Sequence, residues 1–406
     1  MLSQFSVKNY KSIKDEMTFD MQAAAISEHT DRVIKASNGD TLLPVSAIYG
    51  PNGGGKSNVL QALHTLVLKV LRPLYATEAE TQYKPRMKSY EIVPFKFNEE
   101  SKNLPTEFEV FFLTGKAEYR YIIHVLKEIV VYESLSMRKV ETNRTSDIFE
   151  RENGKISMGD GFAKLKVSDD ISDTLPLLSY LGITYRKNEI VDDCIGWFES
   201  GIRFLNYGSP RQELRLAIAN SADIKGLVLD MIREMDLDIE DFDVEERESG
   251  DIQVFTEHNV YGKAYMINLM EESSGTIKLF GLLPFIAESI TKGIALVIDE
   301  LDAKIHPVLL KHIIMLFNNS EINKHGAQLI FTSHDLSTMN SEVFRRDEIW
   351  FVAKGNEQNS MLYSLVEFKN PDGTSVRKDA KYDKQYLEGK YGADPYLKKI
   401  IDWSVI

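Results

Sequence analysis

The feature that most constrains this chain is the glycine-rich stretch Gly50-Pro51-Asn52-Gly53-Gly54-Gly55-Lys56-Ser57. It matches the pattern G-x-x-x-x-G-K-[ST], in which flexible glycines let backbone N–H groups surround phosphate oxygens. The apolar run VSAIY at 45–49 predicts a strand before it, and the apolar periodicity over 57–70 predicts a helix after it. Because a phosphate-binding loop lies between a strand and a helix in this order, the sequence predicts a nucleotide-binding α/β fold.

Two residues at the end of this loop have chemistry of their own. The ammonium of Lys56 is expected to reach the β- and γ-phosphates, and the hydroxyl of Ser57 is expected to bind Mg²⁺. Asn58 follows in the first turn of the predicted helix and is included among the predicted nucleotide-binding residues. The alternative is a glycine-rich turn that matches by chance, and the strand and helix on either side argue against it.

Two adjacent acids, Asp299 and Glu300, follow the apolar stretch 294–298. An apolar strand would carry them to the carboxyl edge of a parallel sheet, where ligands bind in open α/β folds. We expect Asp299 to hold Mg²⁺ and Glu300 to act as the general base on an attacking water. The alternative is a surface acid pair at a strand end. The position of the two acids downstream of the phosphate loop favours a functional role over that alternative.

A histidine, His334, comes directly after another predicted strand at 327–333. From there its imidazole could donate a hydrogen bond to the γ-phosphate or orient the attacking water. His306 instead precedes Pro307 at the start of a predicted helix, so we interpret it as a cap or turn residue.

Strand and helix patterns divide the chain into three parts. Residues from about 107 to 158 alternate like antiparallel strands, with a hairpin turn predicted at 152–155. Residues from about 173 to 235 have helical periodicity, and the segment IGWFESGIRFL at 195–205 is assigned to helix with them. The predicted parts are an N-terminal lobe (1–168), a helical insertion with an acidic segment (169–250) and a C-terminal lobe (251–406).

Composition limits the surroundings and the partners of the chain. The single cysteine, Cys194, excludes an internal disulfide framework, and the longest apolar run, around 279–287, is too short to span a bilayer. The first residues contain no apolar stretch long enough for a signal peptide, so we expect a cytoplasmic protein without membrane contact. The net charge of −13 argues against a broad grip on nucleic acid, although it leaves a confined groove open.

Most of this acidity lies in one segment, residues 230–251, with eleven acids against Arg233 and Arg247. Apolar residues alternate with acids from Met235 to Glu240, which predicts a strand with one acidic face. One interpretation is a solvated edge that discourages aggregation between sheets. The other is a docking face for a basic partner.

Together these motifs resemble the ABC-type ATPases of the SMC, RecF and OLD groups. The resemblance implies a P-loop NTPase with an ABC-type ATPase head, a mixed sheet, an antiparallel β-subdomain and a helical insertion. It also implies ATP and Mg²⁺ as ligands and a homodimer or higher homo-oligomer in which two ATP molecules are sandwiched between protomers. No glutamine has the setting of the family's metal-sensing glutamine loop.

Three further segments resemble motifs of this family. Glu272-Ser273-Ser274-Gly275-Thr276 occupies the place of the signature LSGGQ, which contacts the ATP of the opposite protomer; it departs at three positions but keeps Ser273 and the glycine at Gly275. Asp302, after Leu301, resembles the D-loop at the dimer interface. Lys11, in Asn9-Tyr10-Lys11-Ser12, resembles a basic residue of the N-terminal strand that can touch nucleotide.

More narrowly, the chain is similar to stand-alone abortive-infection ATPases, among them the RloA-like proteins. The similarity rests on the segments NYKSI, ESSGTIK, LDAKIHP, FTSHD and YLEGKYGADP. It implies a role in antiphage defence, as a sensor or regulator of a separately encoded effector such as a Toprim-like or other nuclease. Two other functions stay open: an SMC- or RecF-like clamp on duplex DNA, and a nucleotide-gated scaffold with little turnover.

Overall fold

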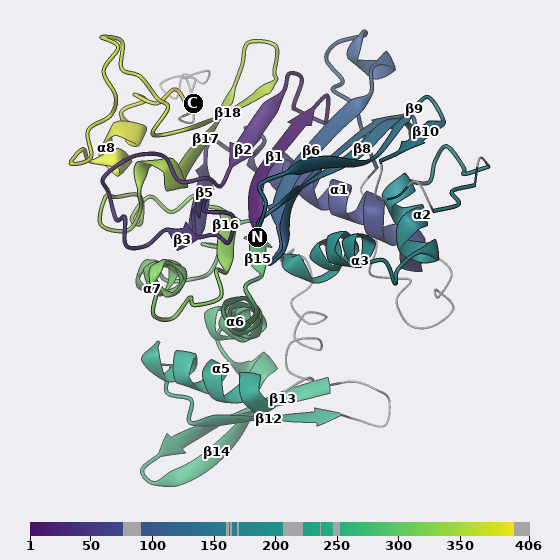
Figure 1. Ribbon diagram of the computed structural model, residues 1–406. Helices are drawn as coiled ribbons and strands as arrows, with labels where there is room; N and C mark the ends of the chain where they lie inside the picture. Colours follow the sequence, from purple (N-terminus) through teal and green to yellow (C-terminus); the bar gives the residue numbers. More distant parts are fainter. Residues whose placement is uncertain are drawn as a thin grey trace, which may run out of the picture.

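The computed structural model describes residues 1–75, 91–159, 162, 165–168, 170–205, 222–235, 237–246 and 252–393. Two large sheets and the helices between and beside them form the main body, and a smaller three-stranded sheet lies at one end of it (Figure 1). This arrangement is the predicted α/β fold with a mixed sheet and a separate antiparallel part.

The central sheet has six strands, of which the first five in spatial order run parallel to one another. Their order is β11 (Ile202–Leu205), β15 (Ala295–Ile298), β16 (Gln328–Thr332), β5 (Val45–Tyr49), β17 (Ile349–Lys354) and the antiparallel β18 (Ser360–Ser364). The inner strands β15, β16, β5 and β17 are buried on both faces, as the continuous apolar runs predict. Because these strands run parallel, their carboxyl ends meet at one edge of the sheet, where the phosphate loop and the Asp299–Glu300 pair lie.

Alternate residues of the central strands belong to two different cores. Ile48, Val297 and Ile330 pack into a core that includes α1 (Lys56–Tyr75). On the opposite face, residues such as Leu296 and Phe331 pack with α6 (Ser274–Lys292) and α7 (Pro307–Asn318). Helices on both faces fix the sheet rigidly, so the loops at its carboxyl edge are positioned by two independent cores.

The second sheet has seven antiparallel strands and shares its core with α1. The order is β10 (Lys155–Met158), β9 (Thr145–Glu152), β8 (Ile129–Lys139), β7 (Ala117–Leu126), β6 (Thr106–Leu113), β1 (Leu2–Lys8) and β2 (Met17–Asp20). The predicted antiparallel region and its hairpin at 152–155 are confirmed. Outside these two sheets, β3 (Ile34–Lys35) and β4 (Thr41–Leu42) form a small hairpin, and α8 (Tyr382–Leu387) packs beside the central sheet, where Tyr386 stacks on Phe351 of β17.

The region predicted as helical contains a strand. Its helices are α2 (Leu177–Thr184), α3 (Glu189–Gly196) and α5 (Ala222–Glu234). The assignment of 202–205 to helix is wrong: a π-helical turn at Trp197–Gly201 ends the α3 segment, and Ile202–Leu205 pairs in parallel with β15. At the edge of the central sheet this segment gains backbone hydrogen bonds to β15, and this tertiary pairing outweighs helical propensity.

The third sheet is formed by β12 (Asp241–Glu246), β13 (Ile252–Val260) and β14 (Lys263–Asn268). It therefore extends across residue 250, where the sequence was divided between insertion and C-terminal lobe. In β12 Phe242 is buried while Asp243 and Glu245 are exposed, so one face is acidic as predicted. That strand begins at Asp241, later than the predicted alternation from Met235; residues 236 and 247–251 of the acidic segment lie outside the described residues.

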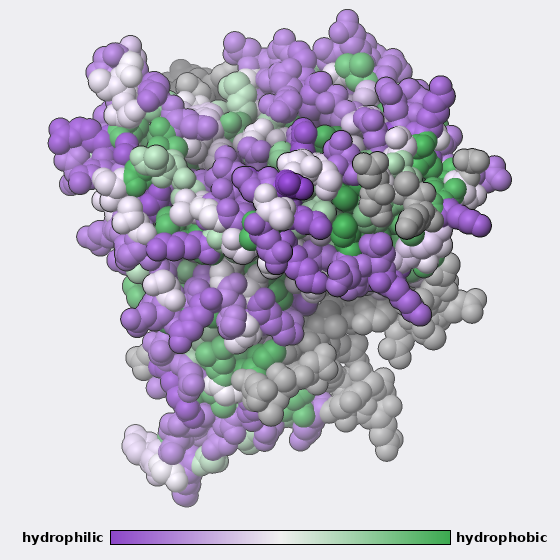
Figure 2. Space-filling model, in the orientation of Figure 1, coloured by the Kyte–Doolittle hydropathy of each residue, from purple (hydrophilic) through white to green (hydrophobic). Residues whose placement is uncertain are grey.

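Hydrophilic side chains predominate on the face of the molecule in Figure 2, with hydrophobic patches between them, one of them in the region of α5 and α6. Within the described ranges, none of the helices combines the length and apolar character needed to cross a membrane.

Candidate functional site

The phosphate loop joins β5 to α1, and two of its glycines, Gly50 and Gly55, have no room for a side chain. A Cβ on Gly50 would lie 2.4 Å from the Val352 carbonyl oxygen, and a Cβ on Gly55, which has φ 110°, would lie 2.1 Å from the Ser360 hydroxyl. Helix α1 then begins at Lys56. The Lys56 ammonium is buried and donates to the carbonyl oxygens of Gly50 at 2.9 Å and Pro51 at 3.4 Å. The lysine thus lies inside the curve of the loop.

Two serines from distant segments support the outside of this loop. The Ser360 hydroxyl, at the start of β18, donates to the Gly54 carbonyl at 2.6 Å and is 2.7 Å from the Ser12 hydroxyl. The Asn58 amide, in the first turn of α1, donates to the same Ser12 hydroxyl at 2.7 Å. The loop is therefore fixed from behind by a hydrogen-bonded chain that joins residues 12, 54, 58 and 360.

The predicted acidic pair lies directly beyond β15, and the neighbouring strand holds it. The Thr332 hydroxyl, at the end of β16, donates to Asp299 Oδ1 at 2.6 Å and accepts from the Glu300 backbone N–H at 2.7 Å. The parallel register pairs Ile298 with Phe331, so the next residues on each strand lie side by side. Glu300 itself has φ 53°, an uncommon conformation for a bulky residue and a form of strain often found at functional sites.

Three carboxylates act electrostatically on the ammonium of the phosphate loop. Burial lowers the pKa of Lys56 below its usual value, and the negative charges of Asp299, Glu300 and Asp302 oppose that shift. The two predicted halves of the site, 50–57 and 299–302, are therefore close enough in space to interact electrostatically. The positive charge of the phosphate loop therefore lies in the field of the acidic edge.

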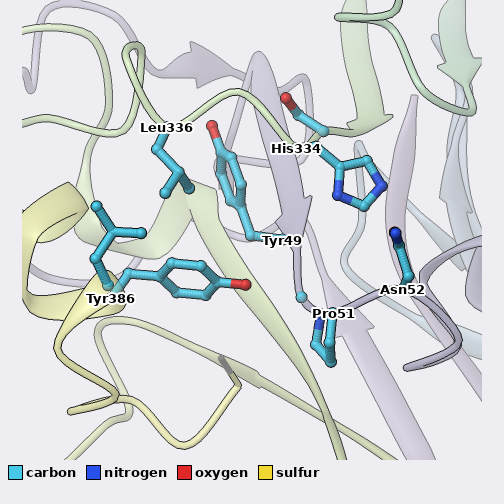
Figure 3. A pocket seen from close by; sticks show the side chains of 9 residues that line it. Tyr49, Pro51, Asn52, His334, Leu336 and Tyr386 are labelled. Carbon is cyan, nitrogen blue, oxygen red and sulfur yellow. The ribbon is translucent and has the colours of Figure 1, made fainter. Parts of the chain in front are cut away.

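His334 and Asp302 meet at the same edge. The backbone N–H of His334 donates to Asp302 Oδ2 at 3.0 Å, while Asp302 Oδ1 is buried and has no partner within the described part of the chain. The imidazole lines a cavity of about 320 Å³ in front of the phosphate loop. Figure 3 shows His334 and Asn52 on one side of this cavity and Leu336 and Tyr386 on the other.

A second, smaller hollow lies at the opposite end of the loop, and both predicted metal ligands line it. Ser57 and Asp299 contribute to its wall together with Gln61, His64 and Phe204. A hydroxyl and a carboxylate are oxygen donors of the kind that Mg²⁺ prefers, with phosphate oxygens and water as the usual further ligands. The described residues contain no group of three or more histidine, cysteine or acidic side chains that could hold a metal without such help.

The side chain of Lys11, from the N-terminal segment, contacts one of the residues that line this second hollow. Its ammonium donates to Gln61 Oε1 at 2.6 Å, and Gln61 lines the hollow beside Ser57. Burial lowers the pKa of Lys11. The predicted nucleotide-binding lysine therefore lies at the margin of the site and contacts α1.

The signature-like segment lies apart from the phosphate loop of its own chain. Ser273 caps α6, and its hydroxyl accepts from the Thr276 N–H at 3.1 Å. Ser273 and Ser274 are exposed. Among the described residues, no hydrogen bond or ion pair joins 273–275 to 50–57. The predicted residues thus form two groups, one at the sheet edge and one at the start of α6.

His306 is a helix cap, as the sequence indicated, because its Nδ1 accepts from the Val308 N–H at the start of α7. Three other contributors were missed: Thr332, Ser360 and the buried Lys278 of α6. Only Lys278 left a signal in the sequence, as a single lysine that opens a long apolar stretch of helix. The residues after β11, where a glutamine loop would reach the same edge, lie outside the described residues.

The fold and the loop geometry define a P-loop nucleotide-binding protein of the ATPase type. Residues 45–340 match the family described as "AAA domain, putative AbiEii toxin, Type IV TA system". The match covers most of the chain and includes the phosphate loop, the acidic pair and His334, so the chain belongs to this family.

Solved structures similar to the chain include three SMC head domains. One is bound to the C-winged helix domain of ScpA (14% identity, 89% of this chain and 97% of that chain, TM-score 0.43). A second is from Thermotoga maritima (16%, 89% and 98%, 0.40), and a third, from Pyrococcus furiosus, has an extended coiled coil and is bound to the C-terminal domain of ScpA (12%, 89% and 96%, 0.39). No curated protein matches the sequence.

Proposed function

We propose that this chain is a Mg²⁺-dependent ATPase that forms a head-to-tail dimer with two ATP molecules sandwiched between its protomers. The observation that carries the proposal is the convergence of Lys56, Asp299 and Glu300 at one sheet edge, where Thr332 of the neighbouring strand holds the two acids by hydrogen bonds. Each protomer would supply the phosphate loop of one site and the signature of the other.

The residues of the loop and the edge divide the chemistry between them. The N–H groups of 50–57 and the Lys56 ammonium bind the phosphates, and Glu300 accepts a proton from the attacking water. His334 orients that water or donates to the γ-phosphate. Mg²⁺ held by Ser57 and Asp299 would neutralise charge that develops on the phosphates.

The exposed start of α6 supports the arrangement across two protomers. Ser273 and the first N–H groups of α6 form a helix N-terminus suited to an anion, yet they make no described contact with their own phosphate loop. A second copy of the chain can bring this helix end to the γ-phosphate. Dimerisation would then depend on ATP, and hydrolysis would release it.

The biological role that we propose is that of a sensor or regulator in antiphage defence, acting on a separately encoded nuclease. The family's description as a toxin of a type IV TA system supports a place in such a system. In a phage-plating assay, the wild-type locus should protect its host and the Lys56→Ala locus should not. Equal protection by both would contradict a role for ATP in defence.

Glu300→Gln tests the ATPase mechanism and the dimer together. The glutamine keeps the shape of the side chain but cannot accept a proton, so phosphate release should fall at least about 100-fold while ATP stays bound. Light scattering should then show a dimer with ATP and Mg²⁺ and a monomer without ATP. Glu321→Gln, at an exposed position on the turn after α7, is the matched control. A Glu300→Gln protein that binds ATP and remains monomeric would show that the sandwich model is wrong.

A further inference from the structure

Helix α6 carries a lysine that is buried against the acidic edge. Lys278 is 6% exposed, and its ammonium donates to three backbone carbonyls, those of Glu300 at 3.2 Å, Leu301 at 3.0 Å and Ala303. An ammonium has three N–H donors, and each of these carbonyl oxygens can accept one of them. Lys278 therefore lies directly against the backbone of the acidic edge.

The three carbonyls belong to residues 300–304, which we term the carbonyl turn. Glu300 at its start has φ 53° and Lys304 at its end has φ 63°, so left-handed residues bound it on both sides. The turn directs several carbonyl oxygens to one point, where their partial charges repel one another unless a cation lies between them. Lys278 therefore determines whether this conformation of Glu300 and Asp302 is stable.

The signature-like segment is attached to the same turn. Ser273 caps α6 five residues before Lys278, so both lie within the first turns of one helix. A Cβ on Gly275 would lie 3.2 Å from the Lys304 carbonyl oxygen, which brings the start of α6 against the end of the carbonyl turn. A displacement of this helix end must therefore move the carbonyl turn or break its contacts with Lys278.

We propose that Lys278 is a positioning residue that couples the two ATP sites of the dimer. This inference rests on the proposed function, in which the signature at Ser273 binds the ATP of the partner and Glu300 acts on the protomer's own ATP. Binding at the signature moves or fixes α6, and the Lys278 ammonium transmits that change to the backbone of Glu300 and Asp302. ATP in one site thereby promotes hydrolysis in the other.

Substitutions at Lys278 separate coupling from folding. Lys278→Met keeps the apolar stem and removes the ammonium, Lys278→Arg keeps the charge, and Lys292→Met removes an exposed lysine of α6 that pairs with Glu288 at 3.0 Å. The wild-type protein should hydrolyse ATP with a Hill coefficient above 1. In Lys278→Met the Hill coefficient should fall to about 1, and kcat should fall about 10- to 100-fold. The Kd for a fluorescent ATP analogue should stay within about threefold of the wild-type value.

The conservative and control variants complete this experiment. Lys278→Arg should retain a Hill coefficient above 1, and Lys292→Met should match the wild type in every measurement. A folded Lys278→Met protein with wild-type cooperativity would overturn the inference, and so would a wild-type Hill coefficient of 1. If Glu300→Gln fails to dimerise, the proposed function fails; if it dimerises and Lys278→Met stays cooperative, only the coupling fails.

A second measurement leaves Lys278 in place, in case its removal prevents folding. A non-hydrolysable ATP analogue should slow hydrogen exchange of the backbone amides in the carbonyl turn of the wild-type protein. In Ser273→Glu, whose negative charge repels the partner's phosphate, the analogue should still bind to the phosphate loop while the added protection of the turn is lost. Protection that persists in Ser273→Glu would contradict transmission through α6.

Discussion

The phosphate loop and the acidic edge face the same site, yet they are built in different ways. Residues 50–57 are continuous in the chain, and their shape depends on Gly50 and Gly55, which have positive φ and no room for a Cβ. The edge draws its parts from three places: the carbonyl turn after β15, Thr332 at the end of β16, and Lys278 on α6. The loop is thus a fixed receptor for phosphate, whereas the edge can respond to whatever moves α6.

The largest expected effect tests the loop. Lys56→Ala removes the cation that lies inside it, and hydrogen bonds to charged phosphates contribute about 1.5–3 kcal/mol each. We expect ATP binding to weaken at least about 100-fold, measured by calorimetry, with the fold intact by circular dichroism. Lys69→Ala, farther along α1, removes contacts with the carboxylate and the backbone carbonyl of Glu128 and should bind ATP as the wild type does. Unchanged binding in Lys56→Ala would exclude this loop as the phosphate site.

The next effect tests the edge without touching the loop. Thr332→Val has nearly the same shape but leaves Asp299 Oδ1 and the Glu300 N–H without their shared partner, at a cost of about 1–3 kcal/mol. The expected result is a fall of about 10- to 100-fold in kcat, with ATP affinity changed much less. Thr106→Val removes another buried threonine hydroxyl, which donates to Asn9, and provides the control. An equal loss of affinity and kcat would mean that loop and edge are not separable.

A smaller effect tests the support behind the loop. Ser360→Ala removes the hydroxyl that donates to Gly54 and contacts Ser12, each a hydrogen bond of about 1 kcal/mol. The Kd for ATP should rise about five- to tenfold, while kcat at saturating ATP stays close to that of the wild type. Ser364→Ala, a buried serine of the same strand, should leave the Kd unchanged. A fall in kcat alone would place Ser360 with the edge.

The smallest effect concerns pH and the lysine of the edge. Burial lowers the pKa of Lys278 to about 8, with Asp302 and Glu300 opposing the shift and Lys304 adding to it. As pH rises through about 8 the ammonium is lost, so kcat of the wild type should fall a few-fold more than kcat of Lys278→Arg, whose side chain stays charged.

Stability has the opposite dependence on pH, which makes this test specific. Between about 8 and 10.5 the unfolded chain holds a proton on Lys278 that the folded chain has released. The contribution of Lys278 to the free energy of unfolding therefore increases as pH rises through that window. If kcat falls with rising pH while the free energy of unfolding, measured with denaturant, does not fall, the loss of the Lys278 proton acts on catalysis. If kcat and the free energy of unfolding fall together, the loss of activity reflects unfolding.

Two sequence-based assignments failed for a common reason. The segment 202–205 was assigned to helix, although it forms β11, because its hydrogen-bonding partner β15 lies about ninety residues further on. The acidic strand was placed from Met235, although it begins at Asp241, where its pairing with β13 begins. Periodicity reports which face of a segment is buried, whereas the partner strand decides where a strand starts and ends.

The sequence by itself determined the phosphate loop, the strands that carry it, the antiparallel region and the order of the motifs, because each depends on residues adjacent in the chain. Only the tertiary structure decided that Thr332 holds both acids, that Ser12 and Ser360 support the loop, and that Lys278 joins the start of α6 to the carbonyl turn. These contacts connect residues that are between 22 and 348 positions apart. Their formation depends on how the two cores pack against the central sheet, and no local pattern records that packing.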